Sequence, residues 1–332
     1  MVVDARVAAA VDGGNEIMNH TTRMKAAIAV ALSSLLTLGS MVHARASAAA
    51  APRTFSSPKD AADALVDAAE KFDVPALEQI FGPDGDDIIH SGEPARDQEI
   101  AKQFAEQARK KMDVSVDPKT KARAFISVGD DEWPFPVPIV KVRNAWSFDS
   151  KAGLNEILLR RIGRNELDAI EICRGYVEAQ EEYAEKKHDD SRVNQYAQKI
   201  ISTPGKQDGL AWQNPDGTWD GPVGENVARA VEHGYTAQSQ PQQYHGYFFK
   251  ILKGQGPAAR LGEIDYLVNG AMIGGFALIA VPAEYRVTGV KTFMVSDDGV
   301  VYQKDLGPNT LEMAKKIDRF NPDRTWSPVQ EK

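Results

Sequence analysis

The spacing of apolar residues changes along this chain of 332 residues, and the change constrains the fold more than any other feature. Over residues 151–186 apolar side chains recur every three or four positions, which predicts one long helix. From residue 244 onward the apolar runs alternate or are continuous, which predicts strands near 247–252, 264–268, 275–280, 290–295 and 299–304. Short turn-rich connections such as Asn269-Gly270 predict hairpins. We therefore expect a long helix packed on an antiparallel β-meander.

The residues before the long helix show the same order, with helices first and strands afterwards. Ser57-Pro58-Lys59-Asp60 is typical of a helix start, because serine caps and proline fits the first turn. Helical patterns cover about 58–71, 75–81 and 94–112, and strand patterns follow at 124–128 and 140–148. Segregated helices and strands indicate an α+β class. We expect a linker at 49–55, an N-terminal α+β domain at 56–150 and a second domain at 151–332.

The beginning of the chain resembles an export signal. Residues 26–42 are apolar and uncharged, Arg23 and Lys25 precede them, and small-x-small triplets end at Ala46 and Ala48. This order predicts a Sec-type signal peptide over 1–48, cleaved near Ala48, and a periplasmic or secreted protein. The alternative is an uncleaved anchor. Met18 or Met24 is a candidate for the true start of translation.

Charge and cysteine content exclude several classes. The formal net charge of -8 argues against a nucleic-acid binder, because no positive field opposes phosphates. The single cysteine excludes a disulfide scaffold and multi-cysteine metal sites. Cys173 falls on the apolar stripe of the long helix, so we expect it to be buried.

Catalytic and metal motifs are missing from the sequence. No two histidines stand at metal-binding spacing, so we expect neither a metal nor a cofactor. Asp265 and Glu284 flank apolar strands and are weak candidates for a hydrolytic carboxylate pair. The competing interpretation of both is turn capping and surface ion pairs.

A loop at 202–212 carries the clearest binding candidates. Pro204-Gly205 predicts a type II turn, and Asp208-Gly209 predicts a second tight turn, which would leave Lys206 near Asp208. A short helix is expected just before it, at 196–201, and another at 222–233. Aromatic residues beside turn-rich segments suit glycan or peptide contact. The binding candidates are Lys206, Asp208, Trp212, His245 and Tyr247, and their alternative role is to make a rigid corner packed on the sheet.

Several long strings in the chain resemble a bacterial family known as domain of unknown function 2950. They include Trp133-Pro134-Phe135-Pro136, Arg161 through Leu167, Ser202 through Leu210, His245 through Leu252, Asp265 through Tyr285 and Gly299 through Gly307. The resemblance covers about 55–330 and implies a secreted protein, without implying an activity. In architecture, the long helix followed by a meander looks like the globular head of type IV pilins and pseudopilins.

Together these features predict an exported envelope protein that acts as a non-enzymatic interaction or assembly module. The expected partner is an envelope protein or a cell-wall component, with no nucleic acid and no membrane span after signal cleavage. The alternatives are a glycan- or peptide-binding periplasmic protein and a hydrolase with paired carboxylates. The sequence leaves the oligomeric state open.

Overall fold

The computed structural model describes residues 51–90, 94–227 and 243–330. The predicted signal peptide and residues 228–233 of the helix predicted at 222–233 lie outside the described residues. The chain divides into two compact units at the bond between Ile157 and Leu158. The sequence-based boundary at 150/151 and this division both fall in the first turns of one helix, α6, which spans Ser150–Ala184.

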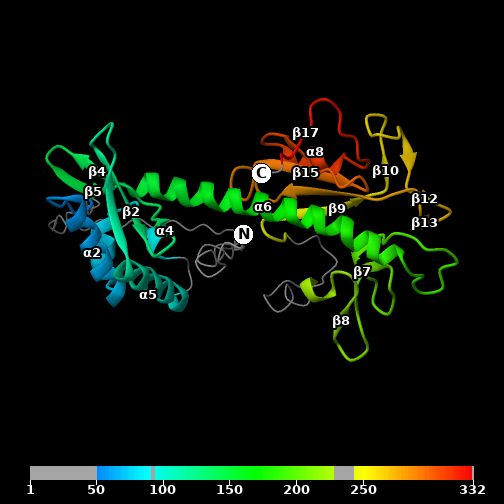
Figure 1. Ribbon diagram of the computed structural model, residues 1–332, viewed down its shortest axis with the longest axis horizontal. Helices are drawn as coiled ribbons and strands as arrows, with labels where there is room; N and C mark the ends of the chain where they lie inside the picture. Colours follow the sequence, from blue (N-terminus) through cyan, green and yellow to red (C-terminus); the bar gives the residue numbers. More distant parts are fainter. Residues whose placement is uncertain (1–50, 91–93, 228–242, 331–332) are drawn as a thin grey trace, which may run out of the picture. The chain divides into compact units, whose positions relative to one another are not determined.

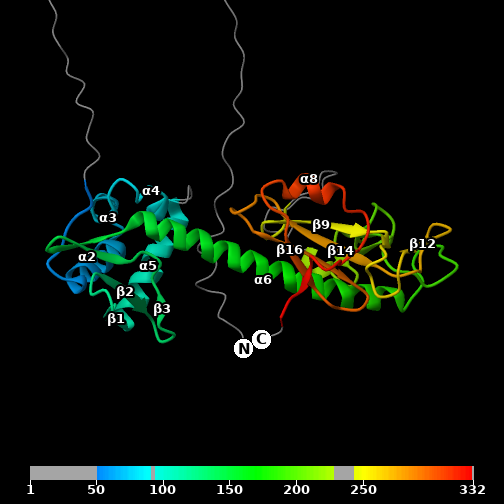
Figure 2. The same ribbon diagram turned by 90° about the horizontal axis from the view of Figure 1, so that it is seen from above.

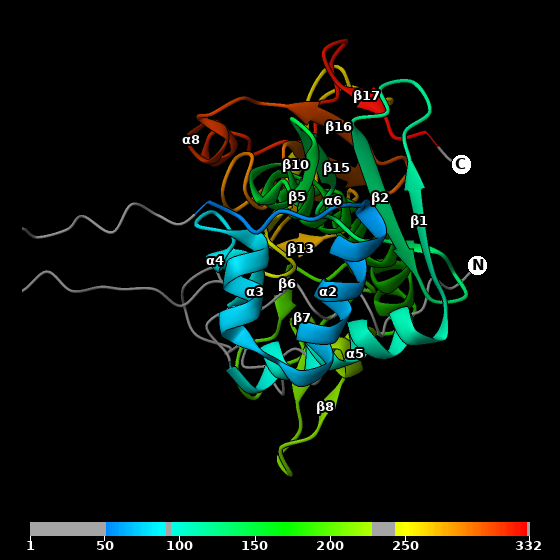
Figure 3. The same ribbon diagram turned by 90° about the vertical axis from the view of Figure 1, so that its left-hand side faces the viewer.

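In its described residues, the first unit places four helices before α6 together with an antiparallel sheet (Figure 3). The helices are α2 (Pro58–Lys71), α3 (Val74–Phe81), α4 (Asp86–Ile89) and α5 (Pro94–Lys110). The strands are β1 (Met112–Val116), β2 (Arg123–Val128), β3 (Trp133–Pro134), β4 (Ile139–Val142) and β5 (Ala145–Phe148). They lie in the order β1-β2-β4-β5, with β3 also paired to β2. The prediction that helices precede a small antiparallel sheet is confirmed, although β1 was missed because the helical pattern was extended to residue 112.

The helix starts in this unit follow the local signals. The Ser57 hydroxyl accepts a hydrogen bond from the Asp60 N–H at 3.1 Å, and Pro58 occupies the first turn of α2. The Asp73 carboxylate caps α3 in the same way, accepting from the Ala76 N–H at 3.2 Å. Such caps satisfy backbone donors that a helix leaves unpaired at its start.

The second unit packs the remainder of α6 on a five-stranded antiparallel sheet (Figure 1). The strands are β9 (Tyr247–Leu252), β14 (Ala277–Pro282), β15 (Lys291–Ser296), β16 (Tyr302–Asp305) and β17 (Ser327–Pro328), in the order β17-β16-β15-β14-β9. Helix α8 (Thr310–Lys315) lies on the other side of the sheet from α6 (Figure 2). The α+β class, with a long helix on an antiparallel sheet, is therefore as predicted. The meander is interrupted, because β9 and β14 are neighbours although other strands separate them in the sequence.

Cys173 illustrates how α6 covers this sheet. Its thiol is fully buried in the core that Tyr176 of α6 forms with Tyr247 and Phe293 of the sheet. Burial raises the pKa of the Cys173 thiol to about 12, because the charged thiolate is disfavoured away from water. The prediction that Cys173 is buried is confirmed.

The described part of the second unit also contains seven short strands. They are β6 (Lys199–Ile201), β7 (Gly209–Gln213), β8 (Trp219–Asp220), β10 (Gly254–Gln255), β11 (Ile264–Asp265), β12 (Leu267–Val268) and β13 (Ala271–Met272). Asn269 and Gly270 join β12 to β13 with φ values of 50° and 84°, as a two-residue hairpin requires. No helix in the part of the chain that the structure describes combines the length and apolar character of a membrane span.

The predicted helix at 196–201 is wrong. The segment is extended, and the buried Gln180 side chain accepts from the Ala197 N–H at 2.7 Å and donates to the Ala197 carbonyl at 2.9 Å. Tyr196 donates its N–H to the Met272 carbonyl at 2.8 Å. These tertiary partners replace the hydrogen bonds that a helix would have supplied.

Candidate functional site

The predicted binding loop joins two strands that run parallel. β6 and β7 pair in parallel register, Lys199 with Gly209 and Ile201 with Ala211. Parallel neighbours usually need a crossover of about a dozen or more residues, whereas only residues 202–208 connect these two. The connection must therefore fold back within a short length of chain, and side-chain hydrogen bonds hold it in that shape.

The first predicted turn in this loop is confirmed and the second is wrong. Lys206 donates its N–H to the Thr203 carbonyl at 2.9 Å, and Gly205 has a φ of 77°, as the third position of a type II turn demands. Gly209 does not turn the chain, because it is the first residue of β7. Its N–H donates to the Ser202 hydroxyl at 2.9 Å.

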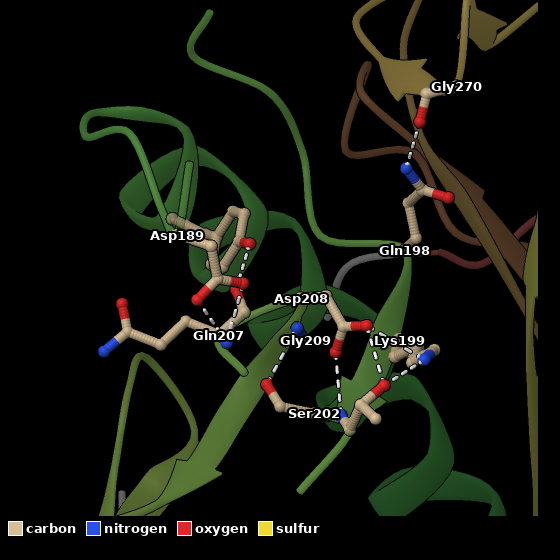
Figure 4. A network of polar contacts seen from close by, with 10 residues as sticks. Asp189, Gln198, Lys199, Ser202, Gln207, Asp208, Gly209 and Gly270 are labelled. Atoms are coloured by element: carbon tan, nitrogen blue, oxygen red, sulfur yellow. Dashed lines mark hydrogen bonds and ion pairs between the residues drawn. The ribbon is translucent and has the colours of Figure 1, made fainter. Parts of the chain in front are cut away.

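Asp208 holds the two ends of the loop together (Figure 4). Its carboxylate accepts from the Thr203 N–H at 2.7 Å, from the Thr203 hydroxyl at 2.8 Å and from the Lys199 ammonium at 2.9 Å. Partial burial alone would raise the pKa of Asp208, but the hydrogen bonds from Thr203 and Lys199 outweigh it and hold that pKa below its usual value. The ion-pair partner of Asp208 is therefore Lys199, and not Lys206, which the sequence analysis had expected near it.

Gln207 is fixed through its backbone from two other elements. The Asp189 carboxylate accepts from the Gln207 N–H, with its two oxygens at 3.0 and 3.1 Å (Figure 4). The buried Tyr183 hydroxyl, near the end of α6, donates to the Gln207 carbonyl. Burial raises the pKa of Tyr183 to about 12, so this hydroxyl keeps its proton at neutral pH.

An aromatic cluster adjoins this loop. The His188 ring stacks on the Tyr183 ring, with the two ring centroids 3.9 Å apart. The centroid of the Trp212 ring lies 5.5 Å from that of His188. His188 Nε2 lies 2.9 Å from the Tyr183 carbonyl oxygen, which can only accept, so this nitrogen carries the hydrogen. Both His188 and Trp212 remain half-exposed. We call His188, Asp189, Lys206, Gln207 and Trp212 the α6-end surface.

Lys206 is the exposed cation of the α6-end surface. Within the described part of the chain its ammonium has no hydrogen-bond or ion-pair partner, and its backbone is fixed by the type II turn. The surface therefore combines a charged group on a rigid backbone with two half-exposed rings. This arrangement suits recognition of an anionic or polar group next to an apolar or sugar face.

His245 and Tyr247 belong to a different part of the second unit. His245 and Gly246 have φ values of 48° and 73°, and the backbone groups of Tyr244 and Tyr247 exchange hydrogen bonds of 2.7 and 3.0 Å across them. This is a two-residue turn of the I′ type, in which histidine is uncommon. The His245 Nδ1–H donates to the Asp168 carboxylate of α6 at 2.7 Å, which ties the turn to the helix.

Tyr247 occupies the core. Its side chain is fully buried and its hydroxyl donates to the Lys291 carbonyl at 2.9 Å. Burial raises its pKa far above the usual value for tyrosine.

Asp168 and two neighbours on α6 were missed by sequence reasoning. Asn165 donates to the Thr288 carbonyl at 2.9 Å, and Glu166 accepts from two backbone N–H groups at the start of β15. Polar residues clustered inside the helix were the available signal.

Asp265 and Glu284 are not brought together. Asp265 pairs with Gly254 just after β9 ends, whereas Glu284 follows the end of β14, beyond the pair that Pro282 makes with Tyr247 at the start of β9. At about 3.3 Å per residue, the length of β9 separates them by roughly 20 Å. That exceeds the ~5–9.5 Å of glycosidase carboxylate pairs. Asp265 instead forms an ion pair with Arg319.

Metal-ligand chemistry is not assembled in the described ranges, where no group of three or more His, Cys, Asp or Glu side chains has the geometry to hold an ion. The α6-end surface thus combines hydrogen bonds, the Lys206 cation, the Asp189 carboxylate and two aromatic rings. Its loop was located by the sequence, but Tyr183, His188 and Asp189 were not, because their contact with residue 207 is a tertiary one.

The comparisons with known proteins give a family and no activity. The family model described as "Protein of unknown function (DUF2950)" matches residues 52–329. The searches of curated proteins and of solved structures returned no match, so the likeness to pilin heads stays a prediction. Because the family model matches most of its length, the chain belongs to the DUF2950 family.

Proposed function

We propose that the protein is exported to the bacterial cell envelope and acts there as a non-enzymatic binding module. Its α6-end surface contacts an envelope protein or a cell-wall component. The observation that carries this proposal is Lys206, an exposed cation on a loop pinned by Asp208, Tyr183 and Asp189. A rigid loop loses little conformational entropy on binding, so it favours recognition.

Export is tested by the amino terminus of the protein recovered from the periplasm or the medium. We expect it to begin at Ala49, after removal of residues 1–48. Mass spectrometry of the intact protein gives this directly. Recovery of the chain with residues 26–42 still attached, in the membrane fraction, would contradict cleavage and support the anchor alternative.

Binding is tested by placing a photo-crosslinking amino acid at position 206 in cells that produce the full chain. The matched control is position 315, where Lys315 is also exposed but lies on α8. We expect defined adducts from position 206 and none from position 315. Treatment of the adducts with a protease or a cell-wall hydrolase then separates a protein partner from a cell-wall partner.

The role of the lysine charge is tested with Lys206→Ala. This substitution touches no hydrogen bond of its side chain in the described residues, so the melting temperature should be unchanged. Partner capture should fall if the surface binds through this cation. Unchanged capture with unchanged stability would assign the loop to a structural corner and overturn the proposal.

A glycan or peptide ligand is the second candidate, favoured by the half-exposed His188 and Trp212 rings. Aromatic faces stack on sugars and on apolar side chains. A thermal-shift screen with peptidoglycan fragments and short peptides should raise the melting temperature of the native chain but not that of Trp212→Ala. Absence of any shift would remove this candidate and leave a protein partner.

A further inference from the structure

A cavity of about 460 Å³ lies in the second unit beside α8. Helix α8 itself lies on the side of the sheet opposite α6 (Figure 2). Much of its wall is apolar, formed by Met294 of β15, Leu306 after β16, Met313 of α8, Ile317 and Trp326. Small-molecule sites are commonly apolar hollows of ~300–1,000 Å³ with a few polar groups at defined positions. The volume and the apolar share of the wall fall within that description, and the hollow is open to solvent on one side.

Two lysines supply the polar groups. Lys304 and Lys316 both line the cavity. Lys304 donates to the Thr325 hydroxyl at 2.7 Å and lies 5.7 Å from the Trp326 ring centroid, so its direct partners are neutral. The Lys316 ammonium has no hydrogen bond or ion pair to any described residue. Neither cation is neutralised by a bonded carboxylate in this part of the chain.

The other charged residues of the wall are already paired. Asp318 forms an ion pair of 3.0 Å with Lys250, and so not with Lys304 or Lys316. Arg319 is bound to Asp265 and donates to the carbonyls of Gln255 and Ile264 at 3.2 Å each. Among the residues that line the cavity the excess charge is therefore positive and resides on Lys304 and Lys316. The carboxylates that interact electrostatically with them without lining the cavity are Asp323 and Glu312.

The strand beneath the cavity carries one more polar group. Thr292 stands opposite Lys304 in the β15–β16 register and shares a strand face with Met294, two residues away. Its side chain is fully buried, and its hydroxyl has no hydrogen-bond partner among the described residues. An unpartnered buried hydroxyl is costly. Thr292 lies next to the cavity-lining residues Met294 and Lys304 but does not itself line the cavity.

We propose that this cavity binds a small carboxylate with an apolar body. The carboxylate lies between Lys304 and Lys316, and the apolar body lies along Met294, Ile317 and Trp326. A single carboxylate has two oxygens, one for each ammonium group. Lys304 can bind one of them while it still donates to the Thr325 hydroxyl. A compact inorganic anion would leave the apolar wall uncovered, so a carboxylate with an apolar body makes more of the available contacts.

Sodium decanoate, below its micelle concentration, is a suitable probe of the mature chain. We expect saturable binding by calorimetry and a change in tryptophan fluorescence, because Trp326 forms part of the wall. Decanol, which has the same chain without the charge, should bind more weakly by about threefold to tenfold. Decyltrimethylammonium, with the opposite charge, should not bind.

Substitutions assign the binding to this cavity. Lys316→Glu should weaken decanoate by more than about tenfold, since it places like charges together. Lys315→Glu is the matched control, with the same charge change on the adjacent residue, whose side chain does not line the cavity; it should leave affinity within about twofold. Trp326→Phe should abolish most of the fluorescence change while calorimetry still detects binding.

Three outcomes would overturn the proposal. They are no saturable decanoate binding by calorimetry, equal binding of decanoate and decyltrimethylammonium, and equal weakening by Lys316→Glu and Lys315→Glu. An anionic lipid headgroup is another source of negative charge, and flotation with phosphatidylglycerol vesicles tests for it separately. Flotation without any response to soluble decanoate would assign the cations to a lipid surface and reject the cavity site.

Discussion

At the scale of single residues, Gly205 shows how backbone conformation constrains the α6-end surface. Its φ of 77° is open to glycine and strained for other residues, and a Cβ built there meets no atom within 4 Å. The whole cost of substitution is therefore backbone strain. We expect Gly205→Val to lower the free energy of unfolding by about 1–3 kcal/mol, measured by urea denaturation.

Gly163 provides the control for that measurement. It lies inside α6, where a Cβ also meets nothing within 4 Å. Because helical glycine is less stable than alanine, Gly163→Ala should raise the free energy of unfolding by about 0.5–1 kcal/mol. A destabilised Gly163→Ala, or an unchanged Gly205→Val, would contradict this account of the two positions.

Asp208 makes the stability of the loop depend on pH. Its pKa is below the unfolded value of about 3.9 because hydrogen bonds from Thr203 and Lys199 outweigh the effect of burial. Its contribution is therefore present above pH 4 and is lost as pH falls through the lower folded pKa. We expect Asp208→Asn to lower stability by about 1 kcal/mol at pH 7, with a smaller difference at pH 3.

Denaturation of both proteins at pH 7, 5, 4 and 3 tests this sign. Asp190→Asn, an exposed carboxylate nearby, is the control and should change stability little at every pH. A difference between Asp208→Asn and the native chain that grows as the pH falls would contradict the assigned role of Asp208.

At the scale of elements, Gln180 joins α6 to the strand segment that leads into β6. The side chain is fully buried and bonds both backbone groups of Ala197 as well as the Tyr176 hydroxyl at 2.8 Å. Gln180→Leu would leave buried backbone groups unpaired, so we expect a loss of about 2–4 kcal/mol in the free energy of unfolding.

Amide hydrogen exchange locates that loss. Protection should fall first at Ala197 and its neighbours in β6, because the removed partner lies there. Glu178→Leu introduces the same side chain at an exposed position of α6 and should have little effect. Equal effects of the two substitutions would contradict a specific role for the Gln180 amide.

At the scale of the whole molecule, the hydrophobic core consists of two separate clusters. One is formed by residues 55–148 and the other by residues 169–320. Ile80 is fully buried in the first and Leu278 almost fully in the second. Each leucine or isoleucine to alanine change in such a core costs about 2–5 kcal/mol.

We therefore expect the two units to lose stability separately. Ile80→Ala should reduce amide protection in residues 58–148 and leave β14 and β15 protected, while Leu278→Ala should do the reverse. Hydrogen exchange with mass spectrometry resolves the two regions in the same sample. A loss of protection throughout the chain from either substitution would show a single cooperative unit.

The local signals in the sequence were sufficient for much of this architecture. The Ser57 and Asp73 caps, the stripe of α6 and the Asn269-Gly270 turn each act through neighbours a few residues away. Such interactions are written in adjacent positions, so the helix and strand order could be predicted. The Pro204-Gly205 turn belongs to the same class.

The α6-end surface depends on contacts between residues that are distant in the sequence, and such contacts are visible only in the folded structure. Tyr183 and Asp189 form hydrogen bonds with the backbone of Gln207. The segment 196–201, which was predicted to be helical, is extended because Gln180 binds the backbone of Ala197. The α+β class, the long helix and the turns at Pro204-Gly205 and Asn269-Gly270 could be predicted from the sequence, because capping, periodicity and turn chemistry are local. The parallel pairing of β6 with β7, the burial of Tyr247 and the separation of Asp265 from Glu284 could not be predicted, because strand pairing and core packing depend on residues far apart in the sequence.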